Sequence, residues 1–196
     1  MTLVLASASA SRRRVLEAAG VLFTAIPANI DEDAVKDDLL TVTPLADMAL
    51  KLAEAKAIDV ATRHREALVI GADQTLLFEG TLVNKCPDMT AARTMLLRLR
   101  GKSHSLISAL VLVRGNEILW RHESHVHLTM RKFSDAFLDW YLAWEGAGLL
   151  AGVGCYRLEG SGSQLFVAVE GDYFSTLGLP LLPLLAELRR QGVIAT

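Results

Sequence analysis

Short apolar runs, separated by polar or helix-forming segments, restrict the fold of this chain more than any single motif does. Residues 106–113 form an apolar run of strand length, and the stretch at residues 177–186 is interrupted by Pro180 and Pro183. Neither run approaches the roughly 20 residues that a membrane-spanning helix needs. With 52% apolar residues in a chain of 196, we therefore expect a buried hydrophobic core and no membrane segment.

Strand-like and helix-like segments alternate along the chain. The expected strands are residues 3–6, 21–26, 67–71 and 165–169, and the expected helices are residues 12–19, 44–65, 90–99, 134–144 and 181–191. Ser134 is expected to cap the helix at residues 134–144. Residues 105–114 and 117–130 are typical of a hairpin about Gly115-Asn116, whereas the polar, acidic residues 28–38 are expected to form a loop. This alternation indicates an α/β protein with a largely buried central sheet, which the hairpin makes mixed.

Charge and targeting features indicate a cytoplasmic protein without a nucleic-acid partner. The basic cluster at residues 12–14 follows the first apolar residues, which is the reverse of a secretory signal. The net charge is −2 with acids and bases scattered, so no basic face is expected. Cys86 and Cys155 match no metal-binding spacing and are expected to be reduced thiols.

The segment at residues 5–12 is the first candidate for a functional site. Its sequence, LASASASR, places small side chains between an expected strand and an expected helix. Small residues let backbone N–H groups approach a phosphate, the helix N-terminus attracts anions, and Arg12 offers a planar fork. The alternative is a tight turn with serine caps and exposed arginines, which the spacing alone favours.

Two acidic segments and two lysines are the next candidates. Asp73 follows a buried strand, where it could hold a hard cation or activate water, or simply cap a turn. The acidic run at residues 31–33 could supply a second carboxylate, or be a solvated charge run. Lys85 lies in an expected loop and could reach a phosphate, whereas Lys56 lies in a long helix, where exposure to solvent is the default.

Taken together, these segments resemble the Maf family over nearly the whole chain and in order. The resemblance extends over residues 5–12, 31–32, 52–57, 70–73, 85–87, 99–104, 170–173 and 177–180. It implies a single Maf-like domain over residues 1–196, with two lobes around a central cleft. The implied fold is a mixed, elongated sheet flanked by helices, similar to that of inosine triphosphatase.

The resemblance also implies an activity and a set of site residues. The expected reaction is hydrolysis of a nucleoside triphosphate between its α- and β-phosphates, which gives the monophosphate and pyrophosphate. Asp73 is the expected catalytic residue, and Glu32 would help it to hold Mg²⁺ or Mn²⁺. The expected phosphate-binding residues are Ser7, Ser9, Arg12, Lys56 and Lys85.

The nucleobase is predicted from Ser11, Gln74 and Glu159. At Gln74 and Glu159 the chain resembles the 7-methyl-GTP branch of the family rather than the thymidine and uridine branch. A carboxylate only accepts hydrogen bonds, so Glu159 suits the adjacent N1–H and 2-amino donors of guanine. Against this, Ser11 stands where the 7-methyl-GTP branch has an aromatic residue that could stack on the base. We therefore expect a guanine-type substrate such as 7-methyl-GTP, with dTTP and UTP as the alternative.

Two other functions are alternatives for this chain. The family is associated with arrest of septum formation, so the chain could inhibit cell division by binding a partner. It could also be an ordinary phosphatase that releases orthophosphate. The retained acids and lysines favour an enzyme over a binding module, and the ion released separates a pyrophosphatase from a phosphatase. The family leads us to expect a homodimer.

Overall fold

The computed structural model describes residues 2–195, which form two compact units. Unit 1 comprises residues 2–74, 107–124 and 172–195, and unit 2 comprises residues 75–106 and 125–171. Three strands, β3 (Leu68–Phe78), β5 (Ser103–Arg114) and β6 (Glu117–Met130), contribute residues to both units. Each unit is described separately below.

The sheet is mixed, as the sequence predicted. Its strand order is β2-β1-β3-β5-β6-β7, and β4 (Thr81–Val83) pairs with β3 outside this path. In unit 1, β1 (Leu3–Leu5) pairs in parallel with β2 (Thr24–Ala25) and with residues 68–70 of β3. In unit 2, β4 is antiparallel to β3, and β7 (Phe166–Glu170) is antiparallel to β6. The α/β class and the mixed sheet are thus confirmed.

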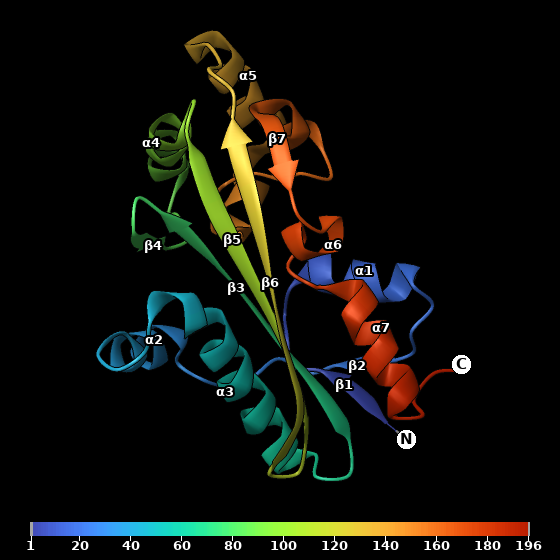
Figure 1. The fold of residues 1–196 in the computed structure, drawn as a ribbon. Helices are drawn as coiled ribbons and strands as arrows, with labels where there is room; N and C mark the ends of the chain where they lie inside the picture. Colours follow the sequence, from blue (N-terminus) through green and yellow to red (C-terminus); the bar gives the residue numbers. More distant parts are fainter. Residues whose placement is uncertain (1, 196) are drawn as a thin grey trace. The chain divides into compact units, whose positions relative to one another are not determined.

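In unit 1, helices cover both faces of the sheet (Figure 1). Alternate residues of a strand point to opposite faces, so Leu68, Ile70 and Ala72 of β3 share one face. They pack in one core cluster with α1 (Ala10–Ala18) and α7 (Leu181–Arg190). The other face of β3, which carries Gly71 and Asp73, meets α3 (Met48–Arg63).

Gly71 is where β3 and α3 come closest. A Cβ atom at this position would lie 2.7 Å from the Ala57 Cβ and would overlap the Ala53 carbonyl oxygen. Only glycine allows this close approach, because any side chain would collide with the α3 backbone. The small residues of α3 therefore hold this helix directly against the strand that carries Asp73.

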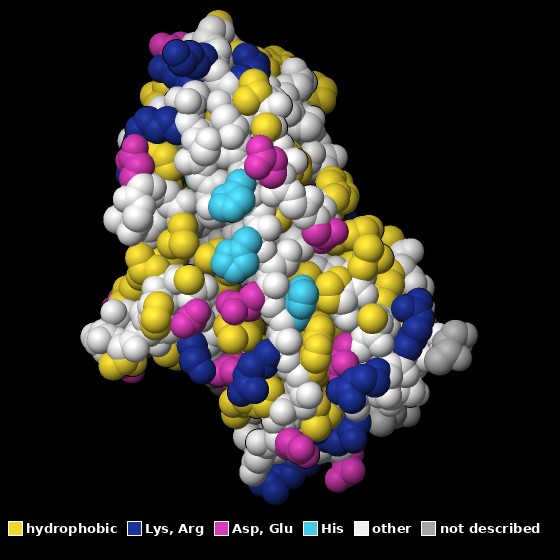
Figure 2. Space-filling model, viewed as in Figure 1, with side chains coloured by type: hydrophobic (Ala, Val, Ile, Leu, Met, Phe, Trp, Pro, Cys, Tyr) yellow, Lys and Arg dark blue, Asp and Glu magenta, His cyan; other side chains and the backbone are white. Residues whose placement is uncertain are grey.

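In unit 2, helices cover one face of the sheet. The core combines β-strand residues with α4 (Met89–Leu99), α5 (Asp135–Glu145), η2 (Gly146–Ala151) and η3 (Ser161–Leu165). On β6, buried Val126 and Leu128 alternate with exposed His125 and His127, which is typical of a sheet with one exposed face. Figure 2 shows histidines at the surface, with acidic and basic side chains interspersed.

Local sequence signals placed most elements close to where the structure has them. Residues 115 and 116 connect β5 and β6, so the predicted hairpin is confirmed. The Ser134 hydroxyl accepts from the Phe137 N–H and caps α5, as predicted. Pro44 precedes η1 (Leu45–Asp47), which leads into α3. No helix in the described part of the chain is long and apolar enough to cross a membrane.

Two expectations about the elements were wrong. Residues 28–38 do not form a loop throughout, because α2 (Glu32–Leu40) begins at Glu32. The Asp31 carboxylate caps α2 by accepting from the Ala34 N–H at 3.1 Å, and acids are favourable in the first turn of a helix. The strand expected to end at Gly71 continues to Phe78, because β3 also pairs with neighbouring strands, with β5 and, at residues 76–78, with β4.

Candidate functional site

The loop between β1 and α1 is held by its own serine hydroxyls. Ser7 Oγ accepts from the Ser9 N–H at 3.2 Å, and Ser9 Oγ caps α1 by accepting from the Arg12 N–H at 3.3 Å. The turn with serine caps, which was the alternative interpretation, is therefore present. Because these oxygens act as acceptors, each O–H is still able to donate, and phosphate oxygens only accept. The capped turn is thus compatible with phosphate binding.

Arg12 is buried and bound to three segments of unit 1. Its Nε donates to the Gly178 carbonyl at 2.9 Å, and its Nη1 donates to Ser7 Oγ at 3.1 Å and to the Ala72 carbonyl at 2.9 Å. Burial lowers the pKa of Arg12, while the charges of Asp73 and Glu32 act in the opposite direction. The expected free fork is not what the structure shows, because neutral acceptors already take Nε and Nη1.

A buried charge cluster joins β3, α3 and α2. Lys56 Nζ lies 2.6 Å from Asp73 Oδ1 and 3.0 Å from Glu32 Oε2. The side chains of Lys56 and Asp73 are 8% and 9% exposed, whereas that of Glu32 is 48% exposed. A lysine in a long helix is expected by default to face solvent, but Lys56 is buried. The structure brings together the three charged residues that the sequence analysis placed in one site.

The alternation of side-chain directions along β3 explains why Asp73 and Lys56 come into contact. Asp73 is two residues after Gly71 and shares its face, so it lies on the side where α3 packs. On α3, Lys56 is one residue before Ala57, which contacts Gly71. The close approach of strand and helix therefore brings the Lys56 ammonium to the Asp73 carboxylate.

Gln74, next in sequence, points to the opposite face. Its Nε2 donates to Ser108 Oγ and the Ser175 carbonyl, both at 2.9 Å, and to the Thr176 carbonyl at 3.3 Å. Ser108 Oγ in turn donates to the Ser175 carbonyl at 2.7 Å. Gln74 therefore anchors α6 (Tyr173–Thr176) to β3.

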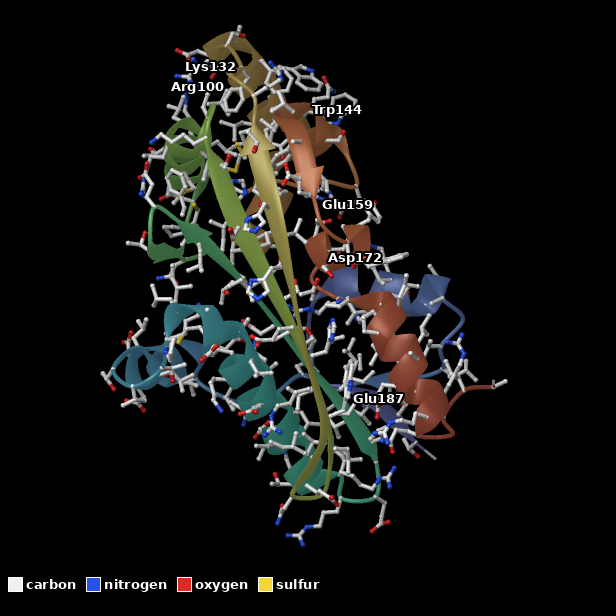
Figure 3. All side chains as sticks on the ribbon, viewed as in Figure 1. Arg100, Lys132, Trp144, Glu159, Asp172 and Glu187 are labelled. Atoms are coloured by element: carbon white, nitrogen blue, oxygen red, sulfur yellow. The ribbon has the colours of Figure 1, made fainter. Side chains whose placement is uncertain are left out.

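Ser108 and the segment around Ser175 were not among the predicted site residues. One signal was available, because Ser108 interrupts the otherwise apolar run at residues 106–113. A second polar anchor is Asp172, labelled in Figure 3, whose carboxylate caps α6 by accepting from the Ser175 N–H and hydroxyl, each at 2.7 Å. Ser11 joins the same region, because its hydroxyl donates to the Leu177 carbonyl at 3.3 Å.

Two predicted site residues, Lys85 and Glu159, belong to unit 2. Lys85 is exposed and lines a cavity of about 560 Å³ together with β4 and one side of α4. Glu159 lies in the turn before η3 (Figure 3), and its Oε1 is 3.7 Å from Arg157 Nε. Lys85 and Glu159 are thus described as parts of unit 2.

The charge cluster of unit 1 suits a hard divalent cation. Asp73 and Glu32 supply oxygen ligands, which Mg²⁺ and Mn²⁺ prefer. Among the described residues, no group of three or more His, Cys, Asp or Glu side chains is placed to hold a metal. Two carboxylates are enough for Mg²⁺, which usually keeps several waters and binds substrate phosphates as well.

Comparisons with known proteins identify the family of this chain. A family model described as "Maf-like protein" matches residues 2–191. A nucleoside triphosphate pyrophosphatase of Granulibacter bethesdensis is 49% identical over 195 residues, which are 99% of each chain. A 7-methyl-GTP pyrophosphatase of Rhizobium meliloti is 51% identical over 193 residues, 98% of this chain and 97% of the relative.

A solved structure of a dITP/XTP pyrophosphatase from Mycobacterium abscessus is also similar, covering 97% of this chain and 94% of that one. Its TM-score of 0.37 at 13% identity is too low to add to the assignment. The family model and the relatives near 50% identity are sufficient: as the resemblance predicted, the chain belongs to the Maf family.

Proposed function

We propose that this protein is a metal-dependent nucleoside triphosphate pyrophosphatase, which cleaves between the α- and β-phosphates and releases the monophosphate and pyrophosphate. The observation that carries the proposal is the buried contact of Asp73 with Lys56, beside Glu32. The relatives named as pyrophosphatases align over nearly the whole chain and support the same reaction.

The contacts of the site residues suggest a chemical role for each of them. Asp73 Oδ1 accepts from Lys56, so we assign Oδ2 to the attacking water. Asp73 and Glu32 would hold Mg²⁺ or Mn²⁺, which offsets charge on the phosphate oxygens. Lys56 and the hydroxyls of Ser7 and Ser9 supply donors for those oxygens, as would Lys85.

Arg12 has a more limited role than a free guanidinium fork. Its three hydrogen bonds fix the loop before α1 to β3 and to the segment at Gly178. Nη2 takes part in none of these three bonds, so we assign to it the phosphate contact of this side chain. Arg12 thus positions the loop and contributes one donor group.

The preferred substrate is proposed to be a guanine-type triphosphate such as 7-methyl-GTP, with Glu159 as the acceptor for its donors. The names of the relatives divide between a general activity and 7-methyl-GTP, so they leave the base open. Because Gln74 anchors α6, its effect on the base would pass through the position of that segment. The substrate pool that we envisage is cytoplasmic.

The test is a panel of 7-methyl-GTP, GTP, dTTP and UTP, assayed with Mg²⁺ for both pyrophosphate and orthophosphate. We expect stoichiometric pyrophosphate from wild type and almost none from Asp73→Asn. Asp59→Asn is the matched control, because Asp59 is on α3 but pairs with Arg63. Release of orthophosphate alone would refute the proposal.

A further inference from the structure

The position of the Lys56 ammonium raises a question about how a metal enters this site. Lys56 Nζ lies between Asp73 Oδ1 and Glu32 Oε2, at 2.6 and 3.0 Å. These are the two carboxylates proposed to hold the metal. The ammonium group is thus bound to the same carboxylates that a divalent cation would need.

Charge makes simultaneous occupation unfavourable. Two carboxylates and one ammonium leave the cluster with a charge of about −1, whereas two carboxylates alone would attract a divalent cation more strongly. The Lys56 and Asp73 side chains are 8% and 9% exposed, so water screens the repulsion between an ammonium group and a metal ion only weakly.

A triphosphate offers the ammonium group another set of acceptors. Lysine has three rotatable donors on a flexible stem and binds phosphate as a point charge. A shift of Nζ from the carboxylates to phosphate oxygens would free the carboxylates at the moment the nucleotide arrives. In this exchange the ammonium group pairs with phosphate oxygens and the metal pairs with the two carboxylates. If the metal entered alone, the ammonium group would be left without a negative partner.

Building on the proposed function, we infer that Lys56 holds the place of the metal between Asp73 and Glu32 until a triphosphate draws the ammonium group away. The nucleotide-free protein then binds divalent metal weakly, and the metal enters together with the nucleotide. A lysine that served only as a structural ion pair would not control metal affinity in this way.

The experiment measures Mn²⁺ binding to the full-length, nucleotide-free protein by isothermal titration calorimetry. Lys56→Met removes the charge and should tighten Mn²⁺ binding at least ~10-fold, given the strength of close charge interactions away from bulk water. Lys51→Met is the matched control, because Lys51 lies on the same helix but pairs with Glu54. It should bind Mn²⁺ like wild type. Equal or weaker Mn²⁺ binding by Lys56→Met overturns the inference.

Two further variants separate the effect of charge from damage to the fold. Lys56→Gln removes the charge but keeps an N–H donor for the carboxylates, and it should also tighten Mn²⁺ binding. Lys56→Arg keeps the charge and should bind Mn²⁺ as weakly as wild type. If Arg and Gln change the affinity equally, the charge of residue 56 does not control metal entry.

These titrations are independent of turnover. Pyrophosphate release by wild type tests the proposed function, whereas Mn²⁺ affinity without nucleotide tests the place-holding role of Lys56. An active wild type with unchanged Mn²⁺ affinity in Lys56→Gln would sink the inference and leave the pyrophosphatase intact.

Discussion

The buried histidine of β5 predicts a specific dependence of stability on pH. His104 is 4% exposed, and its Nε2 lies 2.7 Å from the Tyr156 hydroxyl. Among the described residues, its Nδ1 is buried without a hydrogen-bond partner. Burial lowers the pKa of His104 from 6.5 to about 4, because a charged imidazolium is poorly solvated there.

The sign follows from which state binds more protons. Between about pH 4 and 6.5 the unfolded chain protonates His104 while the folded protein does not, so stability falls as the pH falls. At about 1.4 kcal/mol per pKa unit, the shift gives a loss of ~3 kcal/mol on acidification through this window. Above the unfolded pKa, His104 is neutral in both states and contributes no slope.

The assay is urea unfolding of wild type and His104→Gln at a series of pH values from neutral to about 4. Carboxylates also titrate there, so the informative quantity is the difference between the two proteins. Wild type should lose ~3 kcal/mol more unfolding free energy than His104→Gln. His125→Gln, which removes an exposed imidazole, should follow wild type. Parallel profiles for wild type and His104→Gln would refute the reasoning.

Four other substitutions test the site and its support. Asp73→Asn should lower kcat for pyrophosphate release at least ~10²-fold. It should also lower Tm, because Lys56 loses a buried partner. An active variant would show that Asp73 is not the catalytic residue. Arg12→Lys should cost about 1–3 kcal/mol in urea unfolding, since an ammonium cannot reach three separated acceptors; an unchanged midpoint would contradict this. Glu159→Gln should shift kcat/KM toward dTTP and UTP roughly ten- to hundredfold, the value of a bidentate base contact; an unchanged ratio in the nucleotide panel would reject Glu159 as the base reader. Gly71→Ala should destabilise by about 1–3 kcal/mol or more through collision with α3, and a Tm equal to wild type would show that the helix moves aside freely.

Local signals in the sequence predicted the elements better than the contacts between them. The cap at Ser134 and the turn at Gly115 depend on neighbouring residues, and both were predicted. Helix α2 was missed because acids that cap a helix look the same in sequence as a solvated charge run. The end of β3 was misplaced because its continuation depends on pairing with β4, which is a tertiary interaction.

The site shows the same division between local and tertiary information. The resemblance to the family selected Asp73, Lys56 and Glu32, and the structure brings them into contact. The sequence alone could not show that Lys56 bridges both carboxylates, since the bridge depends on how closely α3 packs at Gly71. Nor could it show that the Arg12 guanidinium donates to backbone carbonyls, because every residue has a carbonyl and the sequence does not tell which one lies nearby.

The opposite orientation of Asp73 and Gln74 has a consequence for how this protein can diversify. Asp73 contacts α3, whereas Gln74 contacts Ser108 and the carbonyls of α6. The two side chains point to opposite faces of the strand and have different hydrogen-bond partners. A different side chain at position 74 therefore changes the contacts of α6, whereas the contact of Asp73 with Lys56 lies on the other face of β3. Variation on one face of β3 can thus alter the α6 segment while the residues of the charge cluster on the other face stay the same.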